Sequence, residues 1–195
     1  MAMRLPAAER REQLLAVALE VFAREGFHLT SMNDVADAAG ITKPVLYQHF
    51  TSKRELYLAV IEEAGARLIN AITDPRIAST SGRQRTELGF RAYFDWIAND
   101  HDAFSLLFGG GSRRDSEFSE VVRGFTSKIA DAIEPLITAD IDADHRRNLA
   151  YAIVGMTEAV SRRLIDRGDE FDPTLVARQV SDLAWAGLRA AQRHS

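Results

Sequence analysis

Glycines and helix-capping side chains divide the N-terminal part of this chain into pieces of helix length. Apolar residues recur at spacings of three and four between Ala7 and Glu25, and Gly26 follows as a residue typical of a helix end. Ser31 and Asp34 have the spacing of a capping box, which marks the start of a second helix. No alternating run of β-branched residues has the length of a strand, so we expect an all-α fold.

The same signals continue to the C-terminus and predict about nine helices. The expected helices run over Ser31–Gly40, Thr42–Phe50, Ser52–Ile72, Arg83–Ile97, Asp102–Phe108, Phe118–Leu136, Asp144–Arg167 and Pro173–Gln192, after the first at Ala7–Glu25. A second capping box, Ser52 with Glu55, begins the fourth helix, which is long enough to belong to two blocks. We therefore expect an N-terminal three-helix domain at 1–51, a connecting helix at 52–72 and a second helical domain at 73–195.

Composition excludes several classes of protein. The 195 residues include no cysteine, which excludes a disulfide scaffold and a thiolate metal site, and we expect no metal and no cofactor. The longest apolar run, Ala150 to Met156, is far too short to cross a membrane. Met1 to Arg10 lacks the pattern of a signal peptide, so we expect a soluble, cytoplasmic protein that does not bind membranes.

The second and third helices form a helix-turn-helix pattern around Gly40, a residue that permits the sharp turn between them. Helical spacing directs Ile41, Leu46 and Phe50 inward. The outward positions are then Lys43, Val45, Tyr47, Gln48 and His49. The net charge of the whole chain is −4, yet the stretch from Ile41 to Arg54 holds three basic residues and no acidic one. Such a local patch is what phosphate binding requires, so the pattern favours double-stranded DNA as a partner.

The segment FHLTSMNDVADAAGITKPVLYQHF, residues 27–50, and the following TSKREL resemble the DNA-binding signature of the TetR family of bacterial transcriptional repressors. The resemblance covers residues 10–58 in detail and implies a helix-turn-helix DNA-binding domain whose third helix enters the major groove. It assigns base contacts to the third helix and phosphate contacts to Tyr47, His49 and Lys53. The full set of DNA-binding candidates is Ser31, Asn33, Thr42, Lys43, Pro44, Val45, Tyr47, Gln48, His49 and Lys53.

Two of these positions depart from the usual pattern of the family. Many members have glycine where Pro44 stands and a small polar residue where Val45 stands. Val45 offers an apolar contact to a thymine methyl group but no hydrogen bond, so the bases that are read stay open.

The second block carries aromatic residues at helical spacing, and the resemblance implies that it is a ligand-binding and dimerisation domain. The candidates for the lining of an apolar effector pocket are Phe90, Tyr93, Phe94, Phe104, Phe108, Phe125 and Met156. Polar anchors could come from Arg91, Asn99, Thr126, Tyr151, Thr157 and Glu158. The expected effector is a small, largely apolar molecule that releases a repressor from a palindromic operator, although activation in place of repression stays open.

The last two helices have more apolar surface than one core contact would cover, which favours a homodimer built on a four-helix bundle. The candidate interface residues are Ile153, Val160, Leu164, Val176, Val180, Leu183, Gly187 and Ala191.

Two other interpretations stay open. An architectural helix-turn-helix protein would bind DNA without ligand control, but it would carry a basic surface, unlike the observed net charge of −4. A small helical enzyme is the other alternative, yet no phosphate-binding loop, zinc-type histidine pair or nucleophile elbow occurs. Asp100, His101 and Asp102 are adjacent and point in divergent directions on a helix, so they would hold a metal ion poorly. We therefore expect no catalytic residues.

Overall fold

The computed structural model describes residues 6–78, 80–109, 118–167 and 171–191. These residues form ten α-helices and one 3₁₀ turn, and no strand occurs within these ranges. The elements are α1 (Ala7–Glu25), α2 (Met32–Ala38), α3 (Lys43–Tyr47), α4 (Lys53–Ile72), α5 (Pro75–Ala78), α6 (Gly82–Asn99), α7 (His101–Phe108), α9 (Ser119–Ile133), η1 (Glu134–Leu136), α10 (Ala143–Arg167) and α11 (Pro173–Ala191). The prediction of an all-α fold is confirmed, and the structure adds the short α5 to the helices expected. The end predicted for the last helix, Gln192, lies outside the described ranges.

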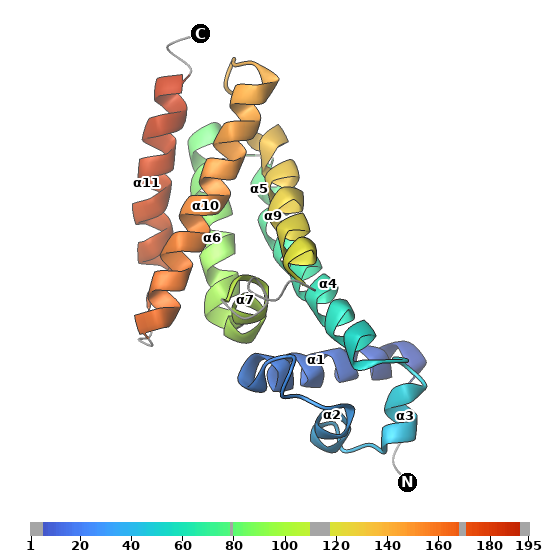
Figure 1. Cartoon of the computed structure of the whole chain (residues 1–195). Helices are drawn as coiled ribbons and strands as arrows, with labels where there is room; N and C mark the ends of the chain where they lie inside the picture. Colours follow the sequence, from blue (N-terminus) through green and yellow to red (C-terminus); the bar gives the residue numbers. More distant parts are fainter. Residues whose placement is uncertain (1–5, 79, 110–117, 168–170, 192–195) are drawn as a thin grey trace.

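Helices α1, α2 and α3 form a small N-terminal unit, here called the head (Figure 1). The inner sides of α1 and α2 are fully apolar, and Leu46 and Phe50 from the α3 region are completely buried against them. Gly40 joins α2 to α3 with a φ of +64°, as predicted for the turn, because a side chain would oppose this backbone conformation.

The start of α4 differs in detail from the predicted capping box. The Ser52 hydroxyl accepts a hydrogen bond from the Glu55 N–H at 3.1 Å, as expected. The Glu55 carboxylate, however, accepts hydrogen bonds from the N–H and the hydroxyl of Thr51 rather than from Ser52. The cap therefore includes one residue more than the pattern predicted, because Thr51 offers two donors to the carboxylate.

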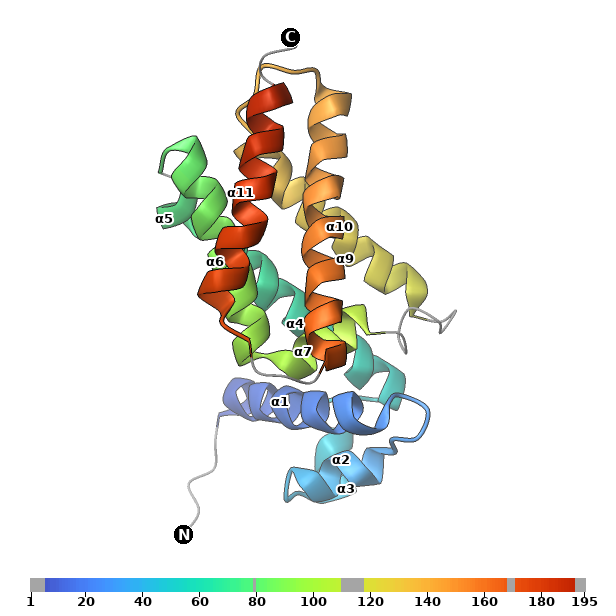
Figure 2. The same ribbon diagram turned by 90° about the vertical axis from the view of Figure 1, so that its left-hand side faces the viewer.

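Helix α4 leaves the head and continues into the C-terminal helices α5 to α11, here called the body (Figure 1). Within the body α11 packs on α6 and α10 packs on α9. In Figure 2, α10 and α11 run side by side over the face turned toward the viewer. One side of this pair is thus backed by the body, and the other side is the outer surface.

Side-chain packing also joins the head to the body, in addition to the continuity of α4. Helix α1 packs along α7. The ring of Phe118, at the start of α9, lies 4.5 Å from the rings of both Phe27 and Tyr57 and is completely buried. A shift of α9 would therefore displace the loop between α1 and α2, because Phe27 lies in that loop.

Candidate DNA-reading surface and effector cavity

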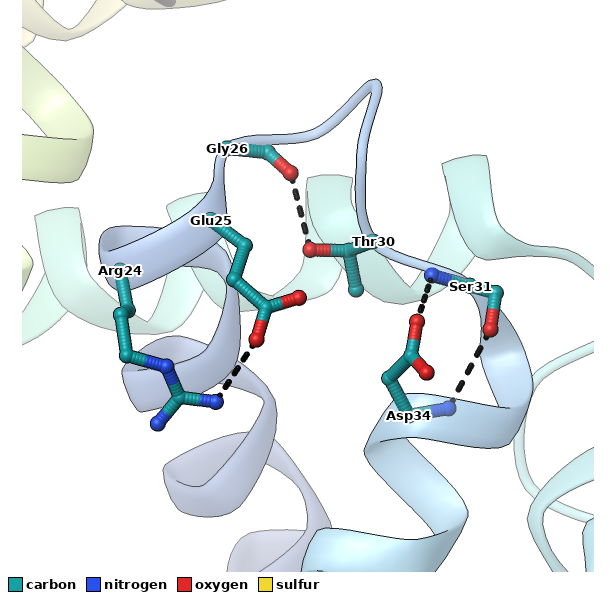
Figure 3. Close-up of polar contacts among 6 residues, drawn as sticks. All are labelled: Arg24, Glu25, Gly26, Thr30, Ser31 and Asp34. Atoms are coloured by element: carbon teal, nitrogen blue, oxygen red, sulfur yellow. Dashed lines mark hydrogen bonds and ion pairs between the residues drawn. The ribbon is translucent and has the colours of Figure 1, made fainter.

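A reciprocal cap fixes the start of α2 in the head. The Ser31 hydroxyl accepts a hydrogen bond from the Asp34 N–H at 3.3 Å, and the Asp34 carboxylate accepts one from the Ser31 N–H at 2.7 Å (Figure 3). The Ser31 hydroxyl, together with this N–H, holds the pKa of Asp34 below its ordinary value. This confirms the capping box predicted for α2, and it leaves Ser31 and Asn33 exposed beside the turn.

The loop before this cap is held by its own side chain and by α4. The buried Thr30 donates its hydroxyl proton to the carbonyl oxygen of Gly26 at 2.8 Å (Figure 3). The Lys53 ammonium donates hydrogen bonds to the carbonyl oxygens of Phe27 at 2.7 Å and Thr30 at 2.8 Å, and lies 4.3 Å from the centre of the Phe27 ring. The charge of Lys53, a candidate phosphate contact in the sequence, is thus engaged inside the head.

Helix α3 presents most of the other candidates to solvent. Leu46 and Phe50 point inward, which confirms the predicted orientation of the helix. The exposed candidates are Thr42, Lys43, Pro44, Tyr47 and Gln48, and the half-buried ones are Val45 and His49. The Lys43 ammonium lies 5.9 Å from the centre of the Tyr47 ring, which places a charge and an aromatic side chain next to each other on this face.

One basic residue beside α3 was missed by the sequence argument. The guanidinium of Arg11, on α1, lies 5.0 Å from the centre of the Phe50 ring and adds a positive charge near the end of α3. Its position three and four residues before the buried Leu14 and Leu15 was the available signal, because such a residue lies on the same side of the helix.

The body contains an apolar cavity of about 80 Å³ between α4, α5, α6, α9, η1, α10 and α11. Its walls include Ile72, Ile77, Phe90, Ile129, Ile133 and Ile153. Four of the lining residues carry polar groups: Arg85, Thr86 and Tyr93 on α6, and Thr157 on α10. The Arg85 guanidinium donates to the carbonyl oxygens of Thr80 and Leu136, so it joins two segments that border the cavity.

Only two of the seven aromatic and methionine candidates, Phe90 and Tyr93, line this cavity. Phe94, Phe104 and Phe108 are completely or almost completely buried core residues, and the rings of the last two pack on each other at 5.1 Å. Phe125 packs on α4 at Gly65, where even a methyl group would overlap its ring. Met156 is half-buried against the core and does not line the cavity.

The sequence placed these residues in the pocket because helical spacing shows that a side chain is inside, but it does not show which inner space it fills. The aliphatic walls from η1 and α9 gave no aromatic signal and were missed. Of the polar candidates, Thr157 is at the cavity, whereas Arg91, Asn99, Thr126, Tyr151 and Glu158 are not among its lining residues.

The outer faces of α10 and α11 differ in part from the predicted pairing surface. Val180 is only 7% exposed and packs inside its own subunit, whereas Ile153 is half-buried and lines the cavity. Val160, Leu164, Val176 and Ala191 are half-buried, whereas Leu183, at 67% exposed, and Gly187 face outward. The exposed residues of these helices include small or apolar ones, namely Ala152, Gly155 and Ala159 on α10 and Leu183, Ala186, Gly187 and Ala190 on α11.

Comparisons with known proteins agree with this architecture over most of the chain. Residues 14–60 match the family model described as bacterial regulatory proteins, tetR family, and residues 83–187 match the tetracyclin repressor-like C-terminal domain. The chain belongs to the TetR family. Regulators of this family bind DNA operators, act as dimers and respond to small-molecule ligands, and the relatives of this chain are transcriptional regulators rather than enzymes.

Two curated relatives cover nearly all of this TetR-family chain. The HTH-type transcriptional activator FasR of Mycolicibacterium smegmatis is 35% identical over 187 residues, which are 95% of this chain and 85% of that protein. The HTH-type transcriptional repressor KstR2 of the same organism is 33% identical over 196 residues, 95% of this chain and 93% of that protein. The direction of control therefore differs between relatives of similar identity.

Solved structures share the fold. A TetR-like transcriptional regulator from Rhodococcus sp. RHA1 is 29% identical, with a TM-score of 0.78 over 95% of this chain and 99% of that one. FadR from Bacillus subtilis, solved in complex with stearoyl-CoA, is 17% identical, with a TM-score of 0.73 over 89% of this chain and 96% of that one.

The described residues lack two further kinds of feature. None of their helices combines the length and the apolar character that a membrane crossing needs. Their histidine, aspartate and glutamate side chains form no group of three spaced to hold a metal ion.

Proposed function

We propose that this TetR-family regulator reads a palindromic operator through α3 and is released from it by a small, largely apolar molecule bound in the body. We assign DNA contact to the domain at residues 1–51 and the connection between the two parts to residues 52–72. The domain at residues 73–195 binds the effector and pairs the subunits. The observation that carries the proposal is the surface of α3, where Lys43, Tyr47 and Gln48 are exposed while Leu46 and Phe50 fix the helix from behind.

The groups on this surface suit different parts of a duplex. Gln48 offers an amide that can pair with the edge of adenine, and Pro44 and Val45 offer apolar contacts to thymine methyl groups. Lys43, Tyr47 and His49 are placed as phosphate contacts, with Thr42, Ser31 and Asn33 as uncharged donors. We assign Lys53 an indirect part in DNA binding, because its ammonium holds the loop that precedes α2.

Pairing of two subunits would place two copies of α3 on one side of the DNA. The exposed small residues of α10, Ala152, Gly155 and Ala159, allow a close approach of a second pair of helices, and the exposed Leu183 supplies apolar area. We propose a homodimer through these faces, with half-sites about 34–36 Å apart or a multiple of this spacing.

The small size of the cavity supports effector control, because a ligand of ordinary size could enter only if the surrounding helices moved. A volume of about 80 Å³ is well below the ~300–1,000 Å³ of typical ligand sites. A bound effector must therefore move apart the helices around it, including α9. Since Phe118 of α9 contacts Phe27 and Tyr57, such a movement favours one arrangement of the heads over another.

The test begins with selection of bound fragments from randomised duplexes, followed by binding curves on the enriched sequence at two salt concentrations. A palindromic consensus bound at least 10³-fold more tightly than random DNA is expected for specific recognition. Equal affinity for all duplexes would contradict the proposal and favour an architectural protein. A promoter-reporter strain then determines the sign of control, for which we propose repression.

Effector control is tested with stearoyl-CoA, the ligand in the FadR structure, because its acyl chain is an apolar group of the kind that the cavity would hold, and with a variant that fills the cavity. A Cβ atom added at Gly89, which lines the cavity, meets no atom within 4 Å. Gly89→Leu should retain operator binding and lose release by the ligand. Gly124→Leu is the matched control, since this helical glycine is equally open but is not among the cavity-lining residues.

A further inference from the structure

A groove of about 560 Å³ lies where the head meets the body, between α1, α4 and the corner at which α6 ends and α7 begins. Arg67 on α4 is the only arginine or lysine among the described residues that line it. The acidic lining residues come from all three walls, so the groove carries an excess of negative charge. They are Glu12 and Glu20 on α1, Glu63 on α4, and Asp100 and Asp102 at the α6–α7 corner.

One ion pair crosses this groove from α4 to the corner. The Arg67 guanidinium lies 2.8 Å from the Asp100 carboxylate, and α4 packs on both α6 and α7. The side chain of Asp100 is 18% exposed and that of Arg67 is 43% exposed, so the carboxylate is the more shielded partner. The pair is therefore a point of attachment between α4 and the α6–α7 corner.

The two helices that the pair joins also form walls of the effector cavity. Ile72 lines the cavity five residues after Arg67, and Tyr93 lines it seven residues before Asp100. At 1.5 Å per residue these separations are about 7.5 Å and about 10 Å along the helices. Expansion of the cavity that moves α4 away from α6 would therefore stretch the ion pair.

Separation of the pair would change the electrostatics between the head and the body. Helix α1 packs on α4 and α7, and it brings the exposed Glu12 and Glu20 to the groove. While the pair is intact, the charge of Arg67 offsets that of Asp100. Once the pair separates, Asp100 has the same sign as the acidic residues of α1, and like charges across the groove repel. This repulsion acts between the head and the α6–α7 corner of the body.

We infer that the Arg67–Asp100 ion pair is a latch that holds the head in the arrangement seen here, and that an effector acts on the head by separating this pair. The inference rests on the proposed role of the cavity as the effector site. It goes further by naming two positioning residues that touch neither the DNA-reading surface nor the cavity.

Spin labels measure the arrangement of the head without operator or effector. The chain has no cysteine of its own, so labels attach selectively to Asp37→Cys on α2 and Gln84→Cys on α6, both exposed positions. Double electron–electron resonance on the full-length protein gives the distance distribution between the two labels, with labelled subunits diluted in unlabelled ones. Arg67→Gln and Asp100→Asn are compared in this background.

An exposed ion pair changes an equilibrium by up to about 5-fold. Arg67→Gln should shift the distance populations away from the wild-type arrangement by roughly 2- to 5-fold, because it breaks the pair and removes the compensating charge. Asp100→Asn should shift them less, since it also removes a carboxylate. The effect of Arg67→Gln should shrink when the salt concentration rises from about 0.01 M to about 1 M, because salt screens exposed charges.

Three results would overturn the inference: an unchanged distance distribution in Arg67→Gln, a larger shift in Asp100→Asn, or a shift that does not depend on salt. The last of these would indicate that Arg67 acts only through packing, which salt does not screen.

Two matched variants control for loss of charge. Arg91→Gln breaks a pair with Asp95 at 2.6 Å, and because both partners are on α6, no movement between helices separates them. Glu62→Gln removes an exposed carboxylate of α4 that is not among the groove-lining residues. Both should leave the distances unchanged, and a shift as large as that of Arg67→Gln in either would overturn the inference.

Operator binding distinguishes failure of this inference from failure of the proposed function. If the wild type binds no operator specifically while Arg67→Gln shifts the distances, only the proposed function is wrong. If the operator is bound and Arg67→Gln changes neither the distances nor the operator affinity, only the latch is wrong.

Discussion

The contacts that stabilise the head differ from those that stabilise the body in how far apart the bonded residues lie in the sequence. In the head and at the start of α4, the caps join residues three or four apart, such as Ser31 with Asp34 and Thr51 with Glu55. In the body, Arg85 on α6 bonds to the carbonyl oxygen of Leu136 in η1, fifty-one positions away, and Arg147 on α10 pairs with Asp131 on α9. Contacts of short range can be inferred from spacing, whereas those of long range depend on how whole helices pack. The two parts should therefore respond differently to substitution.

The largest expected effect distinguishes the core of the body from its cavity. Phe94→Ala removes a completely buried ring, so it should lower the free energy of unfolding by about 3–5 kcal/mol. Chemical denaturation followed by circular dichroism measures this, with the cavity-lining Phe90→Ala as the comparison. A loss below about 1 kcal/mol for Phe94→Ala would place that ring at an open space, as the sequence had suggested.

The next effect distinguishes Lys43, in the head, from Lys53, the first residue of α4. Lys53→Ala removes the charged donor to the carbonyl oxygens of Phe27 and Thr30, so it should cost about 1.5–3 kcal/mol of stability. In the Lys53→Ala variant, operator binding should depend on salt concentration as it does in the wild type. Lys43→Ala should leave stability unchanged and reduce the slope of log affinity against log salt by about 1. Unchanged stability and a reduced salt slope in Lys53→Ala would contradict this assignment and would show that Lys53 contacts a phosphate.

A smaller effect tests whether the head depends on its local caps. Ser31→Ala should lower the unfolding free energy by about 1 kcal/mol through loss of the cap on α2. Thermal melts of wild type and variant at neutral pH measure the difference, and equal melting temperatures would contradict it.

The same cap predicts a pH dependence. Because folding lowers the pKa of Asp34, its contribution is fully present above the ordinary pKa of an aspartate and is lost as the pH falls through the lower value of the folded state. The Ser31→Ala variant should lose less stability than the wild type over this acid range. Urea titrations at a series of acidic pH values measure the unfolding free energy of both proteins. Parallel plots of this free energy against pH would contradict the prediction.

The smallest effect concerns the open space beside Gly89. Gly89→Ala should raise stability by roughly 0.5–1 kcal/mol, because alanine favours a helix interior and its methyl group meets no atom within 4 Å. Thermal unfolding detects the gain, and Gly124→Ala serves as the control for helix propensity alone. A loss of stability in Gly89→Ala but not in Gly124→Ala would mean that other atoms already fill the space beside Gly89.

The sequence by itself determined the head almost completely. The glycine at the turn, the caps and the apolar spacing of α1, α2 and α3 depend on neighbours within a few residues, and the orientation of Leu46 and Phe50 follows from the period of the helix. The same local patterns identified the family signature and the helices of the body. What they missed in the head, the contacts of Lys53 and Arg11, joins residues that are far apart in the chain.

Only the tertiary structure decided which buried residues of the body surround the cavity and which fill the core. Helical periodicity distinguishes inside from outside, but it gives no information on the rotation of one helix against another. Gly65 shows the reason: the missing side chain lets the ring of Phe125 pack on α4, so this aromatic residue fills the core while aliphatic residues from η1 and α9 enclose the cavity. Close packing between helices, which depends on the shapes of both partners, sets these positions.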